Sequence, residues 1–283
     1  MIAVNPQPQT FSTNPIKESA ATSKLPTTKI GNRKEILEIG CGPGVLSQAL
    51  ARWYPEAEVT GTDMDSAFIE FARKEAPDIQ FCEEDATKLS FADESFDVSI
   101  SNTVAEHIEP SKFFGEQYRV LKPGGVCLVL SARRGVNILA SCILENTAFE
   151  NDIWERVQPR FGEVDKKHHV CAYPMNEAEY PLCMEKYGFH HVSTEYITIN
   201  LTPDHPAYSK ESAYAMINAN RQAHLDNISV MEEIASDLVR KDEIEELKRL
   251  ANQKYDKRLA LYDAGEKQWD TNMSLIMVIR GEK

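Results

Sequence analysis

Paired cysteines, long apolar runs and an excess of basic charge are three features that this sequence lacks. Its six cysteines stand singly, with no CxxC pair and no His/Cys cluster, so we predict neither a disulfide framework nor a metal site. No apolar run approaches the roughly 18 residues of a membrane span, and the N-terminus lacks the apolar core of a signal peptide. We therefore expect a cytoplasmic protein with reduced thiols and no membrane partner.

Acidic residues outnumber basic ones by 44 to 31, which gives a formal net charge of -13 over 283 residues. Such a surface repels the phosphate backbone of nucleic acid over most of its area, so nucleic acid is not an expected partner. The length exceeds that of a typical single domain and is short for two. We expect one α/β core with an appended or inserted cap.

Residues 1–34 differ from the rest of the chain because prolines and polar residues replace any apolar periodicity. Pro6, Pro8, Pro15 and Pro26 interrupt a helix here, and Glu18 is the only acid. We predict a flexible N-terminal arm, or a strap that becomes ordered over a ligand.

From Glu35 to about Leu201, apolar runs of strand length alternate with segments of helical period. Helices between strands indicate right-handed crossovers and a parallel sheet that is covered on both faces. The predicted fold is therefore a doubly wound, Rossmann-like α/β domain. Its predicted strands are 35–39, 57–62, 78–82, 96–101 and 125–131, with helices at 44–54, 65–76 and 112–121.

Residues 135–175 depart from this alternation. They show no clean strand pattern and are rich in aromatic and basic groups, within an otherwise acidic protein. This composition favours a lid over an aromatic, anionic or polar small molecule. A helix is expected next, near 176–187, where Gly188 ends it.

A second departure is the long helical region that is predicted over 209–265. Apolar residues recur there at spacings of three and four, and Gly265 closes the run as a C-cap. Alternating patterns at 191–201 and 272–281 predict a strand on either side. We therefore interpret 205–266 as a helical cap inserted into one domain.

The stretch EILEIGCGPG places Gly40, Gly42 and Gly44 directly after the first predicted strand, where an open α/β sheet binds its ligand. The dinucleotide fingerprint GxGxxG would have its third glycine one residue later. In addition, Glu38 ends the strand, and a carboxylate there disfavours a phosphate and suits a cationic group. We expect a ligand that bears an amine and a positive charge.

Two further acids follow the next strands along the chain. Asp63 ends the second predicted strand, where a carboxylate can accept hydrogen bonds from both hydroxyls of a ribose. Asp85 follows the third strand, where it can accept a bond from an adenine amino group, and the apolar Met64 and Ala86 would flank the ring. The ligand is thus expected to have an adenosine-like half.

The segments EILEIGCGPG, VTGTDMD, EEDATKLSFADESFDVSISNTVAEHI and RVLKPGG together resemble the class I S-adenosylmethionine-dependent methyltransferases, of the type 11-like group that acts mostly on small molecules. The resemblance is clear over about 34–131, is weaker through 173–201 and 272–281, and is absent from the arm and the late helices. It implies a methyltransferase domain over 35–283 with a seven-stranded sheet whose last strand is antiparallel. The implied cofactor is S-adenosyl-L-methionine, with S-adenosyl-L-homocysteine as product.

The resemblance also assigns cofactor contacts, position by position. His107, in the loop where the acceptor would approach the methyl group, is the candidate catalytic residue. The other implied contacts are Glu38, Gly40, Cys41, Gly42 and Gly44 for the methionine half, Asp63 for the ribose, Met64, Asp85 and Ala86 for the adenine, and Asn102 and Thr103 for the amino acid head.

The acceptor is expected to be a small metabolite that is methylated at O, N, S or C. Nicotinamide-dependent oxidation and cofactor binding without turnover stay open as alternatives, as does a protein acceptor. The late helices are expected to close the pocket or to form a homodimer contact. Candidate substrate contacts are Arg133, Trp154, Arg156, His168, His169 and Tyr173.

Overall fold

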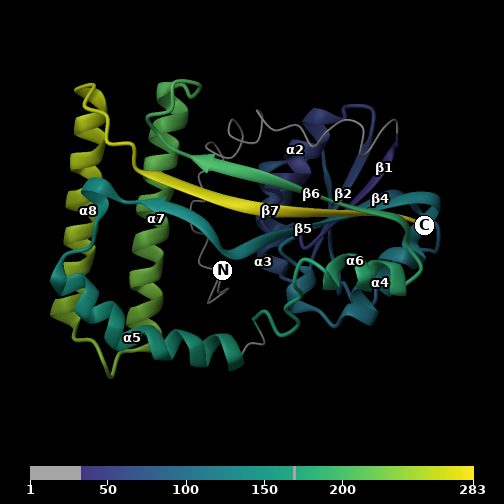
Figure 1. Ribbon diagram of the computed structural model, residues 1–283, viewed down its shortest axis with the longest axis horizontal. Coiled ribbons are helices and arrows are strands. Elements are labelled where there is room, and N and C mark those ends of the chain that lie inside the picture. The colour runs from purple at the N-terminus through teal and green to yellow at the C-terminus, as the bar shows by residue number, and fades with distance from the viewer. Residues whose placement is uncertain (1–32, 168–169) are drawn as a thin grey trace. The chain divides into compact units, whose positions relative to one another are not determined.

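A computed structural model describes residues 33–167 and 170–283, so the predicted arm lies outside the described residues up to residue 32. The chain forms two compact units (Figure 1). The sheet unit comprises 33–136, Cys171–Ile199 and Ser274–Lys283, and the helical unit comprises the described parts of Asn137–Val170 and Asn200–Met273. Each unit is described by itself below.

The described residues form a seven-stranded sheet in the order β3-β2-β1-β4-β5-β7-β6. β1 pairs in parallel with β2 and β4, β2 with β3, and β4 with β5. Lys283, directly after β7, exchanges backbone hydrogen bonds with Gly124 and Gly125 near the start of β5, so β7 is antiparallel. The predicted doubly wound sheet is confirmed. Its strands are β1 (Glu35–Ile39), β2 (Glu58–Asp63), β3 (Gln80–Glu83), β4 (Phe96–Asn102), β5 (Leu121–Ala140), β6 (His190–Leu201) and β7 (Thr271–Glu282).

Helices cover both faces of the sheet. Successive side chains of β1 point to opposite faces, and apolar ones on each face are buried under helices. Leu37 and Ile39 belong to a buried cluster with residues of α4 (Pro110–Val120) and α6 (Glu179–Lys186). Ile36 belongs to a second cluster, which contains Leu50 of α2 (Val45–Trp53). The remaining crossover helix, α3 (Ser66–Glu75), packs Ile69 and Ala72 against Phe81 of β3.

The helical unit contains α5 (Ala148–Lys167), α7 (Lys210–Ile234) and α8 (Lys241–Asp263). Ile153 and Val157 of α5 pack with Ile228 of α7 and Leu247 of α8 in one buried cluster. The helical region predicted at 209–265 is therefore two helices. α5 lies within 135–175, where the sequence showed no clean strand pattern and no helix was predicted, and it contains Pro159, a residue that disfavours a helix interior.

β5 is longer than the predicted strand at 125–131, since it begins at Leu121 and runs to Ala140. A short 3₁₀ turn, η2, follows at Cys142–Leu144. All six cysteines are free. Among the described residues, no helix is both long and apolar enough to cross a membrane.

Candidate active site

The turn between β1 and α2 is built from three glycines with left-handed backbone angles. φ is 69° at Gly40, 51° at Gly42 and 80° at Gly44, a region that residues with a side chain disfavour. A Cβ at Gly40 would overlap Val104, and one at Gly44 would lie 2.7 Å from the Phe81 ring. A Cβ at Gly42 would meet no described atom within 4 Å. Packing explains Gly40 and Gly44, whereas Gly42 borders open space.

Glu38 lies on β1 and is only 2% exposed. Its Oε2 accepts a hydrogen bond from the hydroxyl of Ser47 on α2. Burial raises the pKa of Glu38 to about 8, and the hydrogen bond from Ser47 opposes that rise. The side chain predicted to attract a cation is therefore mainly protonated at neutral pH in this structure.

Asp63, at the end of β2, is tied to the glycine turn by its carboxylate. Oδ2 accepts the backbone N–H of Gly42 at 2.9 Å, and Oδ1 accepts that of Asp65 at 3.0 Å. Each oxygen keeps a second lone pair for another donor. Met64, the next residue, is 78% exposed, which leaves a large apolar side chain uncovered beside this carboxylate.

The loop after β3 lies next to Asp63, because the Glu84 N–H donates to the Asp63 carbonyl oxygen at 2.9 Å. Asp85 is exposed, and its Oδ1 accepts the Thr87 N–H at 2.8 Å. This hydrogen bond lowers the pKa of Asp85, so the side chain stays ionised near neutral pH. Ala86 is half-buried and packs against the sheet core.

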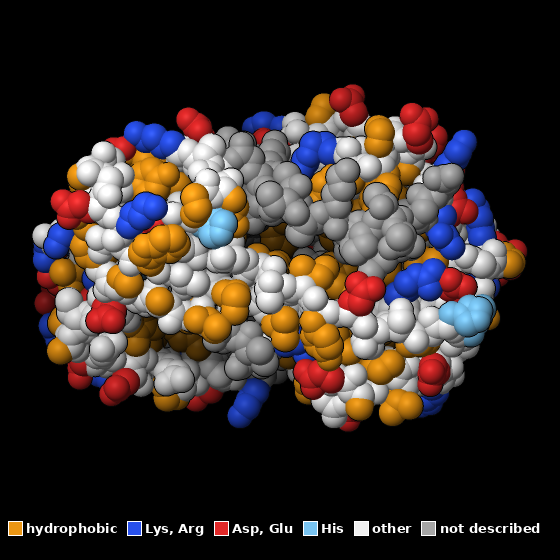
Figure 2. Space-filling model, turned by 45° about the horizontal axis from the view of Figure 1, so that its top comes forward, with side chains coloured by type: hydrophobic (Ala, Val, Ile, Leu, Met, Phe, Trp, Pro, Cys, Tyr) orange, Lys and Arg blue, Asp and Glu red, His pale blue; other side chains and the backbone are white. Residues whose placement is uncertain are grey.

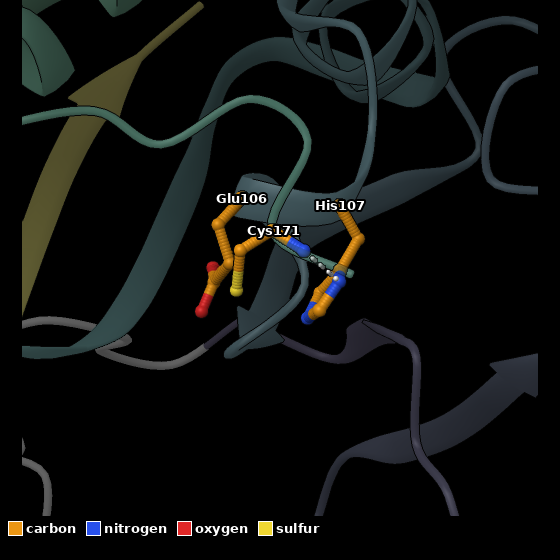
Figure 3. Close-up of side chains that lie close together, drawn as sticks. All are labelled: Glu106, His107 and Cys171. Carbon is orange, nitrogen blue, oxygen red and sulfur yellow. Dashed lines mark hydrogen bonds between the residues drawn. The ribbon is translucent and has the colours of Figure 1, made fainter. Parts of the chain in front are cut away.

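The end of β4 carries the next predicted contacts. Asn102 is exposed, and Thr103 adopts a left-handed φ of 56° while its N–H donates to the Leu130 carbonyl of β5. A 3₁₀ turn, η1 (Ala105–His107), follows. His107 is exposed, and its Nδ1 accepts the Cys171 N–H at 3.1 Å (Figure 3).

These residues gather at the carboxyl ends of β1, β2, β3 and β4. The strand order reverses at β1, which lies between β2 and β4, and this is where open α/β sheets bind their ligands. The family model described as "Methyltransferase domain" matches residues 37–129, within the sheet unit. Residues 37–129 are thus similar to a methyltransferase domain, in line with the resemblance to class I S-adenosylmethionine-dependent methyltransferases.

Curated relatives match over this same part of the chain. The chain is 38% identical to a fatty-acid O-methyltransferase of Mycolicibacterium smegmatis over 104 residues. These residues make up 35% of this chain and 38% of that protein. It is 37% identical to a ubiquinone/menaquinone biosynthesis C-methyltransferase of Desulfotalea psychrophila over 101 residues. These residues make up 34% of this chain and 40% of that protein. The chain thus spans about two fifths of the length of these relatives.

A solved structure extends the likeness of fold over more of the chain. A Galdieria sulphuraria protein described as a sarcosine dimethylglycine methyltransferase covers 94% of this chain and 84% of its own, with a TM-score of 0.50. The sequence identity is 15%, so this likeness concerns the fold alone.

Two predicted substrate contacts belong to the sheet unit, outside the matched methyltransferase domain. Arg133 follows the buried part of β5, and its guanidinium donates to Glu177 Oε1 at 2.8 Å and to the Met175 carbonyl at 3.1 Å. Tyr173 is 41% exposed, and its N–H donates to the Glu106 carbonyl at 2.9 Å. Arg133 is therefore already paired, while the Tyr173 ring is accessible.

The other predicted substrate contacts belong to the segment with α5. Trp154 is half-buried and lies near the rings of Phe161 and His224, and with Phe161 it lines a pocket of about 410 Å³ along α5. Arg156 donates to Glu243 Oε1 at 2.9 Å and to the Leu238 carbonyl at 3.0 Å, so it ties α5 to the region of α8. His168 and His169 lie outside the described residues.

Two neighbours of the predicted residues were not anticipated from the sequence. Ser47 follows Glu38 by nine positions and holds its carboxyl group, which the helical period of α2 alone did not indicate. Cys171 lies beside His107 although 64 positions separate them, and no local pattern indicates that pairing. The predicted roles of the site residues stay predictions.

Proposed function

We propose that this protein transfers the methyl group of S-adenosyl-L-methionine to an O, N, S or C atom of a small metabolite, and releases S-adenosyl-L-homocysteine. The observation that carries the proposal is the turn in which Gly42 borders open space while its N–H is held by the Asp63 carboxylate. A glycine that no described neighbour requires, beside a carboxylate with free lone pairs, suits a ligand that approaches the backbone closely. The names of the relatives support the same reaction.

The proposed cofactor contacts follow the order of the strands. Glu38 and the turn from Gly40 to Gly44, which includes Cys41, would hold the methionine half. Asp63 would accept hydrogen bonds from the ribose hydroxyls, and the exposed Met64 would cover the adenine. The remaining contacts of this proposal are Asp85 and Ala86 at the adenine edge, and Asn102 and Thr103 at the amino acid head.

Bound S-adenosyl-L-methionine supplies a methyl group that is already activated by its positive sulfur. The chain therefore has to hold the acceptor in line with the methyl group, and positioning of this kind contributes about 7 to 11 kcal/mol. His107 is the proposed general base for acceptors that must lose a proton, a role that contributes roughly 10²- to 10⁴-fold. Its Nδ1 accepts the Cys171 N–H at 3.1 Å in this structure, so taking a proton from the acceptor at Nδ1 would require this hydrogen bond to break.

The acceptor is proposed to meet residues outside the matched domain. Tyr173 and Trp154 offer partly exposed rings, and Arg133 and Arg156 offer guanidinium groups that would have to exchange their present partners. His168 and His169 complete the proposed set. The relatives are named for fatty-acid, quinone and other small-molecule substrates, so an acceptor of that size is the first to test.

The proposal also covers binding partners and cellular location. Acidic and basic side chains are interspersed on the visible face of the described residues (Figure 2), and the net charge is -13, so nucleic acid is not proposed as a partner. A cytoplasmic location and a homodimer through the late helices remain part of the hypothesis.

Transfer of radiolabel tests the proposal. The protein is incubated with methyl-labelled S-adenosyl-L-methionine and pools of fatty acids, quinones, amines and thiols, and the small-molecule and protein fractions are counted. Label in a small-molecule fraction is the expected result, whereas label in protein identifies a protein acceptor. In parallel, calorimetry compares S-adenosyl-L-methionine with NAD. Tight cofactor binding without any labelled product favours a binding protein without turnover, and preferential binding of NAD would refute the proposal.

A further inference from the structure

Three side chains with metal-binding atoms converge at η1, directly after β4. Glu106 and His107 belong to η1 itself, and Cys171 arrives from the segment that precedes α6 (Figure 3). One carboxylate oxygen, one imidazole nitrogen and the thiol sulfur all lie within 4.8 Å of one another. All three residues belong to the sheet unit, so their spacing does not depend on the helical unit.

The donor atoms are presented in forms that suit a metal ion. The Cys171 N–H donates to His107 Nδ1 at 3.1 Å, so this lone pair points toward Cys171, and a metal ion there would replace the N–H as its partner. Glu106 Oε2 is buried and has no hydrogen-bond partner among the described residues. A buried carboxylate oxygen without a donor is costly, and a cation offers the interaction that it lacks.

We propose that Glu106, His107 and Cys171 bind a divalent transition-metal ion, with Zn²⁺ as the preferred ion. Thiolate and imidazole ligands select Zn²⁺ over Mg²⁺ and Ca²⁺, which require oxygen ligands. Zn²⁺ replaces the thiol proton of Cys171, which leaves to solvent, and the resulting thiolate and carboxylate together balance the charge of the ion. Metal–ligand bonds of about 2.0 to 2.3 Å require the three donors to close by roughly 1 Å.

A second group with metal-binding atoms is less suited to a cation. His190, His191 and Glu282 also place their donor atoms within 4.8 Å of one another. However, Arg280 donates to Glu282, and this interaction, with that of His191, lowers the pKa of Glu282 to about 2. The carboxylate is already neutralised by a guanidinium, so this group serves as a control.

A guanidinium also lies in the region of the proposed site, but it has its own partners. Arg133, Glu106 and Cys171 are all close enough to Tyr180 to influence its hydroxyl. Arg133 is held by Glu177 Oε1 at 2.8 Å and by the Met175 carbonyl. Its charge is therefore balanced by Glu177, and Glu106 remains available for the ion.

The site has a consequence that rests on the proposed function. Three protein ligands leave one tetrahedral position open, and a bound acceptor thiol or hydroxyl would lose its proton more readily there. Glu106 follows Asn102 by four residues, at the same edge of the sheet as the proposed cofactor contacts. The ion would thereby activate an acceptor heteroatom, in addition to the positioning described above.

Metal titrations test the proposal without reference to activity. The full-length protein is stripped with a chelator and titrated with Co²⁺ by absorption and with Zn²⁺ by calorimetry. We expect one equivalent of Co²⁺ to produce the thiolate charge-transfer band, and Zn²⁺ to displace it. Cys171→Ser should abolish the band, and Glu106→Gln should weaken Zn²⁺ binding at least about tenfold. Cys142→Ser and His191→Gln, at an exposed thiol and at the control group, should change neither.

The outcomes separate this proposal from the proposed function. Absence of the band at one equivalent, or a band and Zn²⁺ affinity that survive both Cys171→Ser and Glu106→Gln, would overturn the metal site. Circular dichroism of each variant shows whether loss of binding reflects loss of fold. S-adenosyl-L-methionine affinity is measured on the same samples. If it is retained while no metal binds, only the metal site fails, and if metal binds while no cofactor binds, only the proposed function fails.

Discussion

The interactions that stabilise the sheet unit differ from those that stabilise the helical unit. In the sheet unit, the glycine turn is built from residues within ten positions of one another, and Glu38 is held by Ser47 nine positions away. In the helical unit, the buried guanidinium of Arg258 pairs with Asp204, which is 54 positions away, and Lys254 pairs with Glu150 across 104 positions. The glycine turn can be recognised as a sequence motif, whereas the distant ion pairs of the helical unit cannot.

The largest effect is expected at the buried ion pair of the helical unit. Asp204 Oδ2 accepts hydrogen bonds at 2.8 Å from Arg258 and from the backbone N–H groups of Gln268 and Trp269. Asp204→Ala leaves the two backbone N–H groups unpaired and Arg258 with Asp270 as its remaining carboxylate partner, and should reduce the free energy of unfolding by about 3 to 5 kcal/mol. Urea unfolding measures the loss, with Asp237→Ala, an exposed partner of Arg160, as control. Equal stability of the two variants would contradict the buried role.

A smaller loss is expected in the glycine turn, where two glycines should respond differently. Gly44→Ala places a Cβ 2.7 Å from Phe81 at a φ of 80°, and should cost about 2 to 4 kcal/mol of stability. In Gly42→Ala the new Cβ meets no described atom, so the free energy of unfolding should fall by only about 1 to 2 kcal/mol. The folded Gly42→Ala protein should nevertheless bind the cofactor more weakly than the folded Gly44→Ala protein. Chemical unfolding and calorimetry measure both quantities. Cofactor affinity that is unaffected by Gly42→Ala would place the ligand elsewhere.

The next effect concerns binding rather than stability. Asp63→Ala removes the proposed acceptor of the ribose hydroxyls, and should weaken S-adenosyl-L-methionine binding by about 1.5 to 3 kcal/mol. Asp65→Ala is the matched control, since Asp65 caps α3 by accepting the Ala67 N–H at 2.9 Å and its loss should affect stability alone. Calorimetry measures the affinity of both variants for S-adenosyl-L-methionine. Similar affinities of the two variants would show that the assignment of Asp63 to the ribose is wrong.

A further effect is a dependence of stability and of cofactor affinity on pH through Glu38. Burial raises its pKa from 4.5 to about 8, so the unfolded chain releases this proton at lower pH than the folded protein, and stability falls as pH rises from about 4.5 to about 8. A cationic cofactor lowers the pKa again, so binding releases a proton and affinity should rise by up to about tenfold per pH unit below pH 8. Glu38→Gln should flatten both profiles, and a pH-dependent affinity that survives it would exclude Glu38 as the source.

The fold of the sheet unit was predictable because its determinants are local. The five strands predicted between 35 and 131 are all present, and the closing strands at 191–201 and 272–281 correspond to β6 and β7. The helical unit was less accessible. Pro159 argues against a helix by itself, yet Ile153 and Val157 are buried against α7 and α8, and this packing outweighs the lost backbone hydrogen bond.

The candidate site shows the same division. Gly42 and Asp63 were predicted from spacing along the chain, and the structure joins them by a hydrogen bond. The state of Glu38 could not be predicted, because its raised pKa depends on how deeply β1 is buried. Cys171 could not be associated with His107 either, since their contact arises from the course of the chain after α5.

Three strands, β5, β6 and β7, each begin or end in one unit and continue into the other. Because β6 and β7 are adjacent in the sheet, a short hairpin could in principle replace everything between Leu201 and Thr271. That replacement would remove α7 and α8, against which α5 packs its apolar residues. The segment after β5 that contains α5 would therefore have to be replaced at the same time. Recombination that exchanges the helical unit must therefore replace both segments together rather than one.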